Sequence, residues 1–535
     1  MPLSTEQMRE FAVLQGLTDP DALLTDIRER DAQQFAERPQ DLIELCADWR
    51  EHHRIRSHRE QVESNIATKL KPRKKESAEL SQEQAIEGAS RLALAALLTR
   101  KLTLRHSADG DSIHASEAAL DVSKILLDWS ADAQSVLLER TLLGFASYGR
   151  VRFHHRSVLE FLAAKRLDTL LARGVPIKSV KRLLFVETAQ GARTVRPSMR
   201  PVAAWLAVWH QTIFDEILKL DPATILNHGD PQSLGPGQRI RALEAYVARY
   251  GQGGWRGLST PEIQVHRFAC PELAASVRLL WQGGIENPEV RTLLLRLIAV
   301  GKLTECADIA RAVANDAGED IRERTLAIEA MVQIKDEQLG ALVASIEAEP
   351  DRWPDVMARR AVIELFPRHV SVEQLSNILS RVQEHPRSIG ELSHRLPHES
   401  ESALLTPEYL DELRQALSAL VIDGMTWDRN KFPHLRTRRY HLVPALSAAC
   451  RRQETANIRS DAWIASSLLA VRLSKEEYST ERDALASLRR ALNELPPGAR
   501  ERAFWEESRF VASVHKINSA WERLFDLSPW RHSTD

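Results

Sequence analysis

The sequence is poor in residues on which particular fold classes depend. Glycine is scarce, at 22 of 535 residues. This disfavours all-β sandwiches and α/β folds with phosphate-binding loops, because both use glycine in their turns. The four cysteines, at positions 46, 270, 306 and 450, lie far apart and form no CxxC pair. They therefore fit neither a disulfide framework nor a zinc site, and they predict a reducing, cytoplasmic location.

An excess of one charge and long apolar runs are also missing. Lys and Arg number 72 and Asp and Glu 74, so the formal net charge is −2, without the basic excess typical of proteins that bind nucleic acids or membrane surfaces. No stretch reaches about 18 uninterrupted apolar residues, and the first residues lack the pattern of a signal peptide, so no membrane span is predicted. With 43% hydrophobic residues the chain is not expected to be disordered. Its length predicts about three to five folded units.

Helical periodicity dominates the rest of the sequence, which predicts an all-α fold. After Pro39, the apolar residues within 42–49 follow the spacing i, i+3, i+4 and i+7, which places them on one face of a helix. A second buried helix is predicted over 90–99. One strand is predicted in the first 200 residues, at 149–153, where apolar and basic residues alternate after a glycine.

A capping pattern follows the predicted strand. Ser157 and Glu160 have the spacing S-x-x-E, which predicts a helix N-terminus at Ser157. A strand that leads into a capped helix, after several helices, is typical of a small winged-helix unit. His155 would then lie just before the helix, where unpaired N–H groups and the helix dipole favour an anion such as phosphate. The alternative is that His155 only packs the corner between strand and helix.

From about residue 285 the sequence predicts stacked helix pairs. Helix openings recur at 287–289, 318–320 and 353–355, at steps of roughly 31 and 35 residues, which is typical of an α-solenoid of HEAT-like repeats. Residues 385–400 contain two prolines and are predicted to form a long loop. Helices are predicted to resume at Pro407 and to continue to about residue 525.

Motifs for enzymatic chemistry are missing from the sequence. It contains no GxxxxGK[ST], GxGxxG, HExxH or GxSxG pattern and no kinase signature, so no catalytic residue is assigned. The histidine pairs 52–53 and 154–155 have no carboxylate or cysteine at ligand spacing, so no metal site is predicted. The basic runs 69–75 and 429–439 are interpreted as a solvated linker and a solvated loop. Phosphate contact by these runs, mostly by the second, is the alternative, and nucleic-acid binding is not expected.

Residues 153–164 resemble the winged-helix motif of NACHT-type STAND NTPases, which is written F-x-H-x-[ST]-x-x-E-[FY]-x-A-A. Residues 38–42 resemble the proline motif of the helical lid in that family. Segments between 196 and 231 resemble the helical bridge of its large bacterial members, so that the resemblance covers most of residues 1–380. The positions that match the winged-helix motif are Phe153, His155, Ser157, Glu160, Phe161, Ala163 and Ala164.

The resemblance implies a nucleotide-dependent switch. In the family the lid proline packs against adenine and the winged-helix histidine contacts the β-phosphate of ADP, roles that Pro39 and His155 would take. The P-loop, the magnesium-binding acidic motif and the parallel sheet are missing from this sequence. The resemblance therefore implies the switch-and-sensor half of a split or truncated NTPase, in bacterial antiviral defence or signalling.

The same resemblance implies which partners the chain would have. The chain alone is expected to have no ATPase activity and no cofactor, and ATP or ADP would bind only together with a P-loop-bearing chain encoded upstream. A protein ligand is expected on the solenoid, with homo-oligomerisation on activation. The alternative is a stand-alone α-solenoid scaffold that binds a protein and has no nucleotide role.

The family resemblance and the helix spacing together predict the domain organisation. The predicted units are a helical lid subdomain (1–75), a winged-helix subdomain (76–170), a helical bridge (171–284), HEAT-like helical repeats (285–384) and a C-terminal helical region (401–535).

Overall fold

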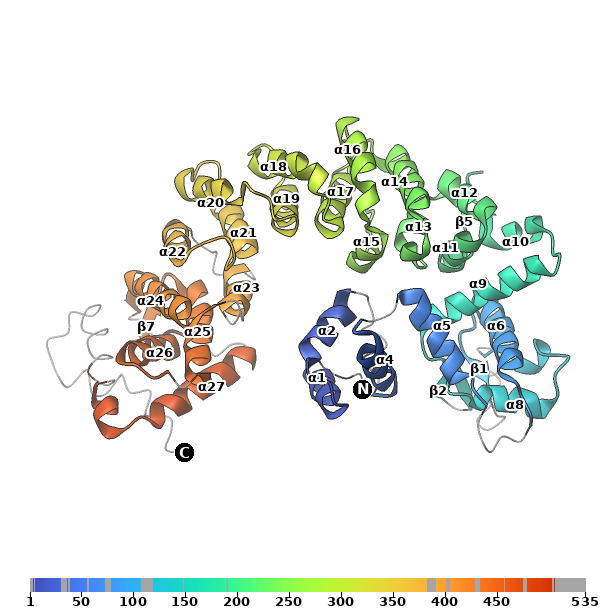
Figure 1. Cartoon of the computed structure of the whole chain (residues 1–535), viewed down its shortest axis with the longest axis horizontal. Helices are drawn as coiled ribbons and strands as arrows, with labels where there is room; N and C mark the ends of the chain where they lie inside the picture. Colours follow the sequence, from blue (N-terminus) through green and yellow to red (C-terminus); the bar gives the residue numbers. More distant parts are fainter. Residues whose placement is uncertain are drawn as a thin grey trace. The chain divides into compact units, whose positions relative to one another are not determined.

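The protein is mainly helical, with only small antiparallel sheets, as the computed structural model in Figure 1 shows. This confirms the all-α prediction. The chain divides into two compact units, an N-terminal unit (Met1–Cys306) and a C-terminal unit (Ala307–Asp535). Across the described part of the chain, no helix is long and apolar enough to cross a membrane. The structure describes residues 3, 5–29, 36, 39–54, 57–72, 78–106, 119–147, 149–189, 191–382, 391–400, 405–428, 434–456, 458–474, 479–502 and 505.

The described residues at the start of the N-terminal unit are helical. Proline at the first position of α4 suits a helix start, because its missing N–H would be unpaired there in any case. Leu42, Leu45 and Cys46 are buried, as the periodicity predicts, and α4 packs against α1. The helices are α1 (Thr5–Leu14), α2 (Pro20–Glu29), α4 (Pro39–His52) and α5 (His58–Lys69).

A three-stranded antiparallel sheet with strand order β1-β3-β2 follows these helices. The predicted strand is present as β3, whereas β1 and β2 carry too little alternation to be predicted from the sequence. The predicted helix over 90–99 is the second half of α6, which packs against α9. The elements of this segment are α6 (Gln82–Thr99), β1 (Leu104–Arg105), η1 (Val122–Lys124), α8 (Ala131–Glu139), β2 (Leu143–Ser147), β3 (Arg150–Phe153) and α9 (Arg156–Ala172).

Gly88 lies in the middle of α6 because the Trp129 ring packs directly against it. A Cβ atom at Gly88 would lie 2.6 Å from Cη2 of Trp129 and 2.8 Å from Cδ2 of Leu137. Glycine inside a helix is normally about 1 kcal/mol less favourable than alanine, so this close approach explains its presence.

We expect Gly88→Ala to destabilise the N-terminal unit by about 1–2 kcal/mol, because overpacking outweighs the gain in helix propensity. Gly237→Ala is the matched control, since Gly237 also lies in a helix and its added Cβ would meet nothing within 4 Å. The control is expected to leave stability unchanged or slightly higher. Urea denaturation measures both, and equal effects of the two substitutions would contradict the packing argument.

From α11 to α17, each helix packs against the helix two places further along the chain. Helices α11, α13, α15 and α17 form one row, and α12, α14 and α16 form the other (Figure 1). This alternating packing extends to both sides of residue 285. The elements are α10 (Ile177–Leu184), β4 (Phe185–Glu187), β5 (Arg193–Val195), η2 (Pro197–Met199), α11 (Arg200–Trp209), α12 (Gln211–Leu220), α13 (Ala223–Asn227), η3 (Pro231–Ser233), α14 (Pro236–Tyr250), α15 (Glu262–Phe268), η4 (Pro271–Leu273), α16 (Ala274–Gln282), α17 (Pro288–Gly301) and η5 (Thr304–Cys306).

The C-terminal unit has the same alternating arrangement, in which α19 packs against α21, α21 against α23, and α23 against α25. A two-stranded antiparallel sheet, β6 with β7, is inserted after α24. The elements are α18 (Ala307–Asn315), α19 (Ile321–Gln333), α20 (Leu339–Ala348), α21 (Asp355–Leu365), α22 (Val372–Arg381), α23 (Glu391–Ser400), α24 (Pro407–Asp423), β6 (Met425–Asp428), β7 (His434–Thr437), η6 (Tyr440–Leu442), α25 (Val443–Thr455), α26 (Asp461–Leu473) and α27 (Ser479–Asn493).

The predicted helix openings are confirmed, and the predicted long loop is wrong in part. Helices α17, α19 and α21 begin at the three recurring openings, and α24 begins at Pro407. Residues 391–400, predicted as loop, form α23, whose Leu392 and Leu396 are completely buried. Their burial favours a helix although Pro397 lies inside it. Residues 383–390, and those of the predicted C-terminal helices after 505, lie outside the described residues.

Buried arginines donate hydrogen bonds to backbone carbonyls near helix ends in both units. The last carbonyls of a helix have no partner within that helix, and a guanidinium can serve several of them at once. Arg239 donates to the Leu234 carbonyl over 3.0 Å and to the Gln232 carbonyl over 2.8 Å. Arg324 donates to the Ala314 carbonyl over 3.1 Å and lies 4.4 Å from the centre of the Trp353 ring.

Candidate functional site

His155 occupies the junction between β3 and α9, as predicted. Its backbone is extended, with φ −119° and ψ 134°, and its side chain is only 5% exposed. The His155 carbonyl accepts a hydrogen bond from the Leu159 amide over 3.2 Å, so His155 itself is the N-cap residue of α9. The imidazole is therefore part of the packed corner in this conformation.

The predicted capping box at Ser157 is wrong. The helix begins at Arg156, so Ser157 lies within its first turn and cannot cap it. The Ser157 Oγ is buried and has no hydrogen-bond partner among the described residues. Glu160 instead accepts a hydrogen bond from Arg156 Nε over 2.8 Å, and burial raises the pKa of the Glu160 carboxyl. The S-x-x-E spacing was misleading because the helix starts two residues earlier than the spacing indicates, with His155 as its N-cap residue.

His154, the other member of the histidine pair, packs against the backbone of β2. A Cβ atom at Gly144 would overlap with the His154 ring, which explains why β2 has glycine at this position. In the described ranges, no group of three or more His, Cys, Asp or Glu side chains could hold a metal ion.

The motif of residues 153–164 forms much of the packing face of α9. Phe153, Phe161, Ala163 and Ala164 are all buried. The Phe161 ring lies nearly perpendicular to two indoles of α11, with centroid distances of 5.1 Å to Trp205 and 5.7 Å to Trp209. The motif therefore joins the sheet segment to the helix rows.

The N-terminus of α5 packs against the same two tryptophans. The His58 ring stacks on Trp205 at 5.8 Å, and the Arg59 guanidinium lies 5.9 Å from the centre of the Trp209 ring. Lys165 of α9 lies 5.1 Å from the same ring. Burial, together with the nearby Arg267, holds the pKa of His58 well below its usual value.

Asp230 completes the N-terminus of α5 from a distant part of the chain. Its Oδ2 accepts hydrogen bonds from the Arg59 amide over 3.3 Å and from the Ser233 hydroxyl over 2.8 Å. Gly229 precedes it with φ +68°, and a Cβ atom there would lie 3.0 Å from the Cβ of Ala204. The Gly-Asp-Pro sequence at 229–231 thus has a structural role in docking α5 against α11.

A second buried polar cluster surrounds Asp221. Its carboxylate accepts hydrogen bonds from Arg200 Nε and the Thr224 hydroxyl, both over 3.0 Å, and from the Tyr250 hydroxyl over 3.4 Å. The pKa of nearby His228 is lowered, mainly by burial and further by Arg200. The Arg200 guanidinium thus compensates the charge of the buried Asp221 carboxylate.

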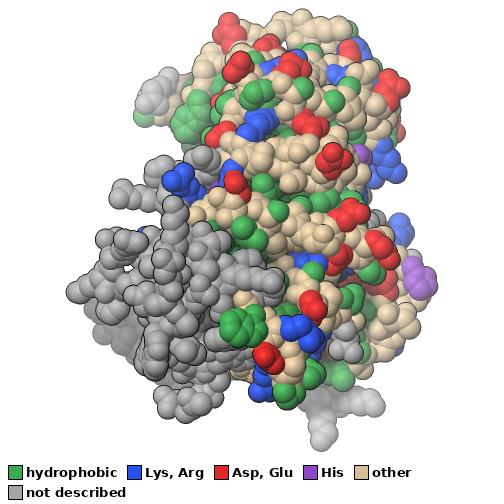
Figure 2. Space-filling model, turned by 90° about the vertical axis from the view of Figure 1, so that its left-hand side faces the viewer, with side chains coloured by type: hydrophobic (Ala, Val, Ile, Leu, Met, Phe, Trp, Pro, Cys, Tyr) green, Lys and Arg blue, Asp and Glu red, His purple; other side chains and the backbone are tan. Residues whose placement is uncertain are grey.

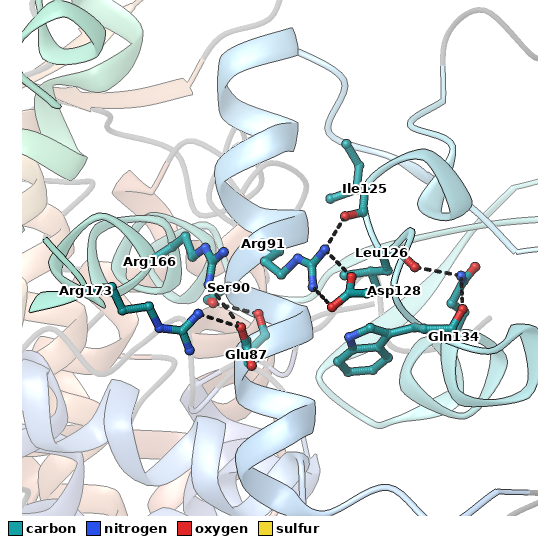
Figure 3. Close-up of polar contacts among 10 residues, drawn as sticks. Glu87, Ser90, Arg91, Ile125, Leu126, Asp128, Gln134, Arg166 and Arg173 are labelled. Carbon is teal, nitrogen blue, oxygen red and sulfur yellow. Dashed lines mark hydrogen bonds and ion pairs between the residues drawn. The ribbon is translucent and has the colours of Figure 1, made fainter. Parts of the chain in front are cut away.

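Ion pairs fix α6 to the segments on either side of it (Figure 3). Two guanidinium nitrogens of Arg91 donate hydrogen bonds to the Asp128 carboxylate, over 2.9 and 2.6 Å. Arg91 also donates to the Ile125 carbonyl over 2.7 Å. Glu87, one turn earlier, accepts hydrogen bonds from Arg166 of α9 and from Arg173, which directly follows that helix, both over 3.3 Å. The η1–α8 segment and α9 are thereby both attached to α6.

The two residues expected to contact nucleotide lie in different surroundings. Pro39 is exposed in the first turn of α4, which packs against α1. His155 is buried at the start of α9, which packs against α6 and α11. Residue 38, the preceding residue of the lid motif, lies outside the described residues.

The two basic runs are only partly described. Residues 73–75 of the first run, and 429 and 431 of the second, lie outside the described residues. Arg439 of the second run donates to the Leu379 carbonyl over 2.9 Å and to the Val382 carbonyl over 2.7 Å, so it serves the end of α22. On the described part of the face in Figure 2, acidic and basic side chains are interspersed.

Comparisons with known proteins add no relative. No protein-family model matches the sequence, and no curated protein matches it significantly. The likeness of residues 153–164 to the NACHT motif therefore depends on the motif itself and on the elements around it.

Proposed function

We propose that this chain is the switch-and-sensor half of a NACHT-type STAND NTPase, which senses nucleotide only together with a P-loop-bearing partner. The observation that carries the proposal is the order of elements around the motif. Helix α6, β1, η1, α8 and the β2–β3 hairpin follow one another as in a winged-helix unit, with sheet order β1-β3-β2. The motif histidine then stands at the start of the next helix, α9.

In the proposed mechanism, His155 is a positioning and sensing residue. The first N–H groups of α9 favour an anion, and the imidazole at the N-cap could donate to a phosphate oxygen from the same side. The sequence has no Walker A motif, so a partner must hold the triphosphate and its magnesium. Nucleotide would favour the closed state, and a protein ligand on the helix rows, proposed as a HEAT-like solenoid, would favour an open state able to self-associate.

This proposal predicts where nucleotide binds. The purified chain is expected to bind neither ATP nor ADP in isothermal titration calorimetry. Co-purified with the product of the upstream reading frame, it is expected to retain ADP, and His155→Ala should weaken that retention at least tenfold. His154→Ala is the matched control, because His154 packs on Gly144 and is not expected to contact the phosphate.

Three results would count against the switch. Magnesium-dependent ATP turnover by the isolated chain would show that the nucleotide site needs no partner. Equal loss of ADP in the two histidine variants would point to a general packing defect. Failure of the two chains to associate would favour the scaffold described next.

An alternative function is a stand-alone helical scaffold that binds a protein. It is favoured by the burial of the motif side chains, since Phe153, His155 and Phe161 all pack within the junction itself. Under this alternative, His155→Ala would alter stability and would leave ligand binding by the helix rows unchanged.

A further inference from the structure

The loop between α14 and α15 carries the most exposed tryptophan of the described residues. Trp255 is 74% exposed, whereas Trp205, Trp353 and Trp463 are buried. Tryptophan is enriched among the few residues that dominate the binding energy of protein interfaces. An indole held out in water therefore marks a candidate contact for a partner.

The backbone of this loop is fixed by the segment that precedes α17. The Gly251 carbonyl accepts hydrogen bonds from the amides of Glu286 and Asn287, over 2.9 and 3.0 Å. The Gly253 amide donates to Glu286 Oε2 over 3.0 Å. Gly253 has φ +80°, a backbone conformation that residues other than glycine rarely adopt. A loop held in this way has little conformational entropy left to lose on binding.

The Trp255 ring is also held in place. A Cβ atom at Gly257, where φ is +73°, would lie 3.5 Å from Cη2 of Trp255, so the ring lies against this glycine. Between the two, the Arg256 amide donates to Glu289 Oε2 over 2.7 Å. The indole is therefore positioned by the loop while most of its surface stays in contact with water.

Arg256, next to Trp255 in the loop, and Arg249, in the last turn of α14, have no carboxylate partner among the residues that the structure describes. The Arg249 guanidinium lies 5.9 Å from the centre of the Tyr250 ring. Arg256 Nη2 donates to the Gln252 carbonyl over 2.7 Å. The nearby carboxylates of Glu286 and Glu289 accept hydrogen bonds from backbone amides of the loop and not from these two guanidinium groups. The loop thus combines an exposed indole with one cation that has no carboxylate partner, and the helix that precedes the loop supplies a second such cation.

We propose that loop 251–257, together with Arg249, docks an acidic segment of a protein partner. Trp255 would pack against an apolar side chain of that segment, and the two arginines would pair with its carboxylates. Proteins that bind single-stranded nucleic acid stack successive bases on aromatic rings along a basic groove. This loop has one exposed ring and so offers no second ring for the next base, whereas one acidic segment with one apolar side chain matches a single indole. The inference does not depend on the nucleotide-switch proposal.

The test is selection of random phage-displayed peptides on the immobilised full-length chain, followed by fluorescence anisotropy with the synthesised peptides. We expect selected sequences rich in Asp and Glu around an apolar residue, with affinity at least tenfold weaker for Trp255→Ala. Gly257→Val should weaken binding too, because a β-branched residue is strained at φ +73° and its side chain displaces the indole, which is itself retained. Phe145→Ala is the control, since Phe145 is 76% exposed on β2, and its affinity should stay within twofold of the wild type.

Several outcomes would overturn the proposal. These are the recovery of no peptide above background, the recovery of peptides without acidic residues, and equal affinity of the wild type and Trp255→Ala. A labelled oligothymidylate that binds more tightly than every selected peptide, and is released by Trp255→Ala, would replace the protein partner with a single-stranded nucleic acid. Circular dichroism of each variant verifies that it folds, and none of these results bears on ADP retention.

Discussion

Replacing Trp205 with alanine is expected to lower the free energy of unfolding of the N-terminal unit by about 3–5 kcal/mol. The side chain is 1% exposed, so the substitution leaves a cavity that the surrounding helices cannot fill completely. It also removes the edge-to-face contact with Phe161 and the stacking contact with His58, through which α9 and α5 meet α11. Urea denaturation followed by circular dichroism measures the change.

Trp255→Ala is the matched control for this substitution, because it deletes the same side chain at a position that is 74% exposed. Its expected effect is within about 0.5 kcal/mol, as for most surface substitutions. If Trp205→Ala were equally mild, the two tryptophans of α11 would not hold the motif helix, and the packing described at this junction would be wrong.

The stability of the C-terminal unit is expected to fall by about 3 kcal/mol in acid because of His441. Burial, with help from Arg439 and Arg359, lowers the pKa of His441 to about 4 in the folded chain, against about 6.5 when unfolded. Above pH 6.5 both states are neutral at this residue and its contribution is complete. As the pH falls from 6.5 towards 4, only the unfolded chain binds the proton, and each pH unit costs up to about 1.4 kcal/mol.

His441→Leu isolates this effect from the other histidines with lowered pKa. Within the described part of the chain, neither ring nitrogen of His441 has a hydrogen-bond partner, so leucine sacrifices no hydrogen bond there. The variant should match or exceed the wild type at pH 7 and lose less stability by pH 4, as measured by urea denaturation across that range. Parallel pH profiles for the two proteins would contradict the argument.

Local patterns in the sequence predicted those parts of the fold that depend on local interactions. The start of α4 at Pro39 and of α24 at Pro407 follows from the fixed backbone of proline, and the buried face of α4 follows from its apolar spacing. The failures share a non-local cause. Leu392 and Leu396 stabilise α23 only because α21 and α25 cover them, and no residue near Pro397 indicates this.

The candidate site shows the same division. The position of His155 before a helix could be predicted from a strand followed by a helical pattern, but the burial of its side chain could not. The His154 ring packs on the backbone of Gly144, and Phe161 contacts α11. Both contacts join residues that are not neighbours in the sequence, so no local pattern predicts them. Nor does a glycine-rich stretch reveal by itself that Glu286 and Glu289 will fix its shape.

The hydrogen bond from the Arg59 amide of α5 to Asp230 has a consequence for protein synthesis. Arg59, whose amide Asp230 accepts, precedes it by 171 residues. At translation rates of about 5–20 residues per second, roughly 10–30 seconds pass between the emergence of α5 and that of its partner. Trp205, on which His58 stacks, also leaves the ribosome long after α5. Ser57 and Glu60 cap the start of α5 locally, whereas on the nascent chain the Arg59 amide must bond to water in place of Asp230. The helix can dock only after the segments around α11 and η3 have been made.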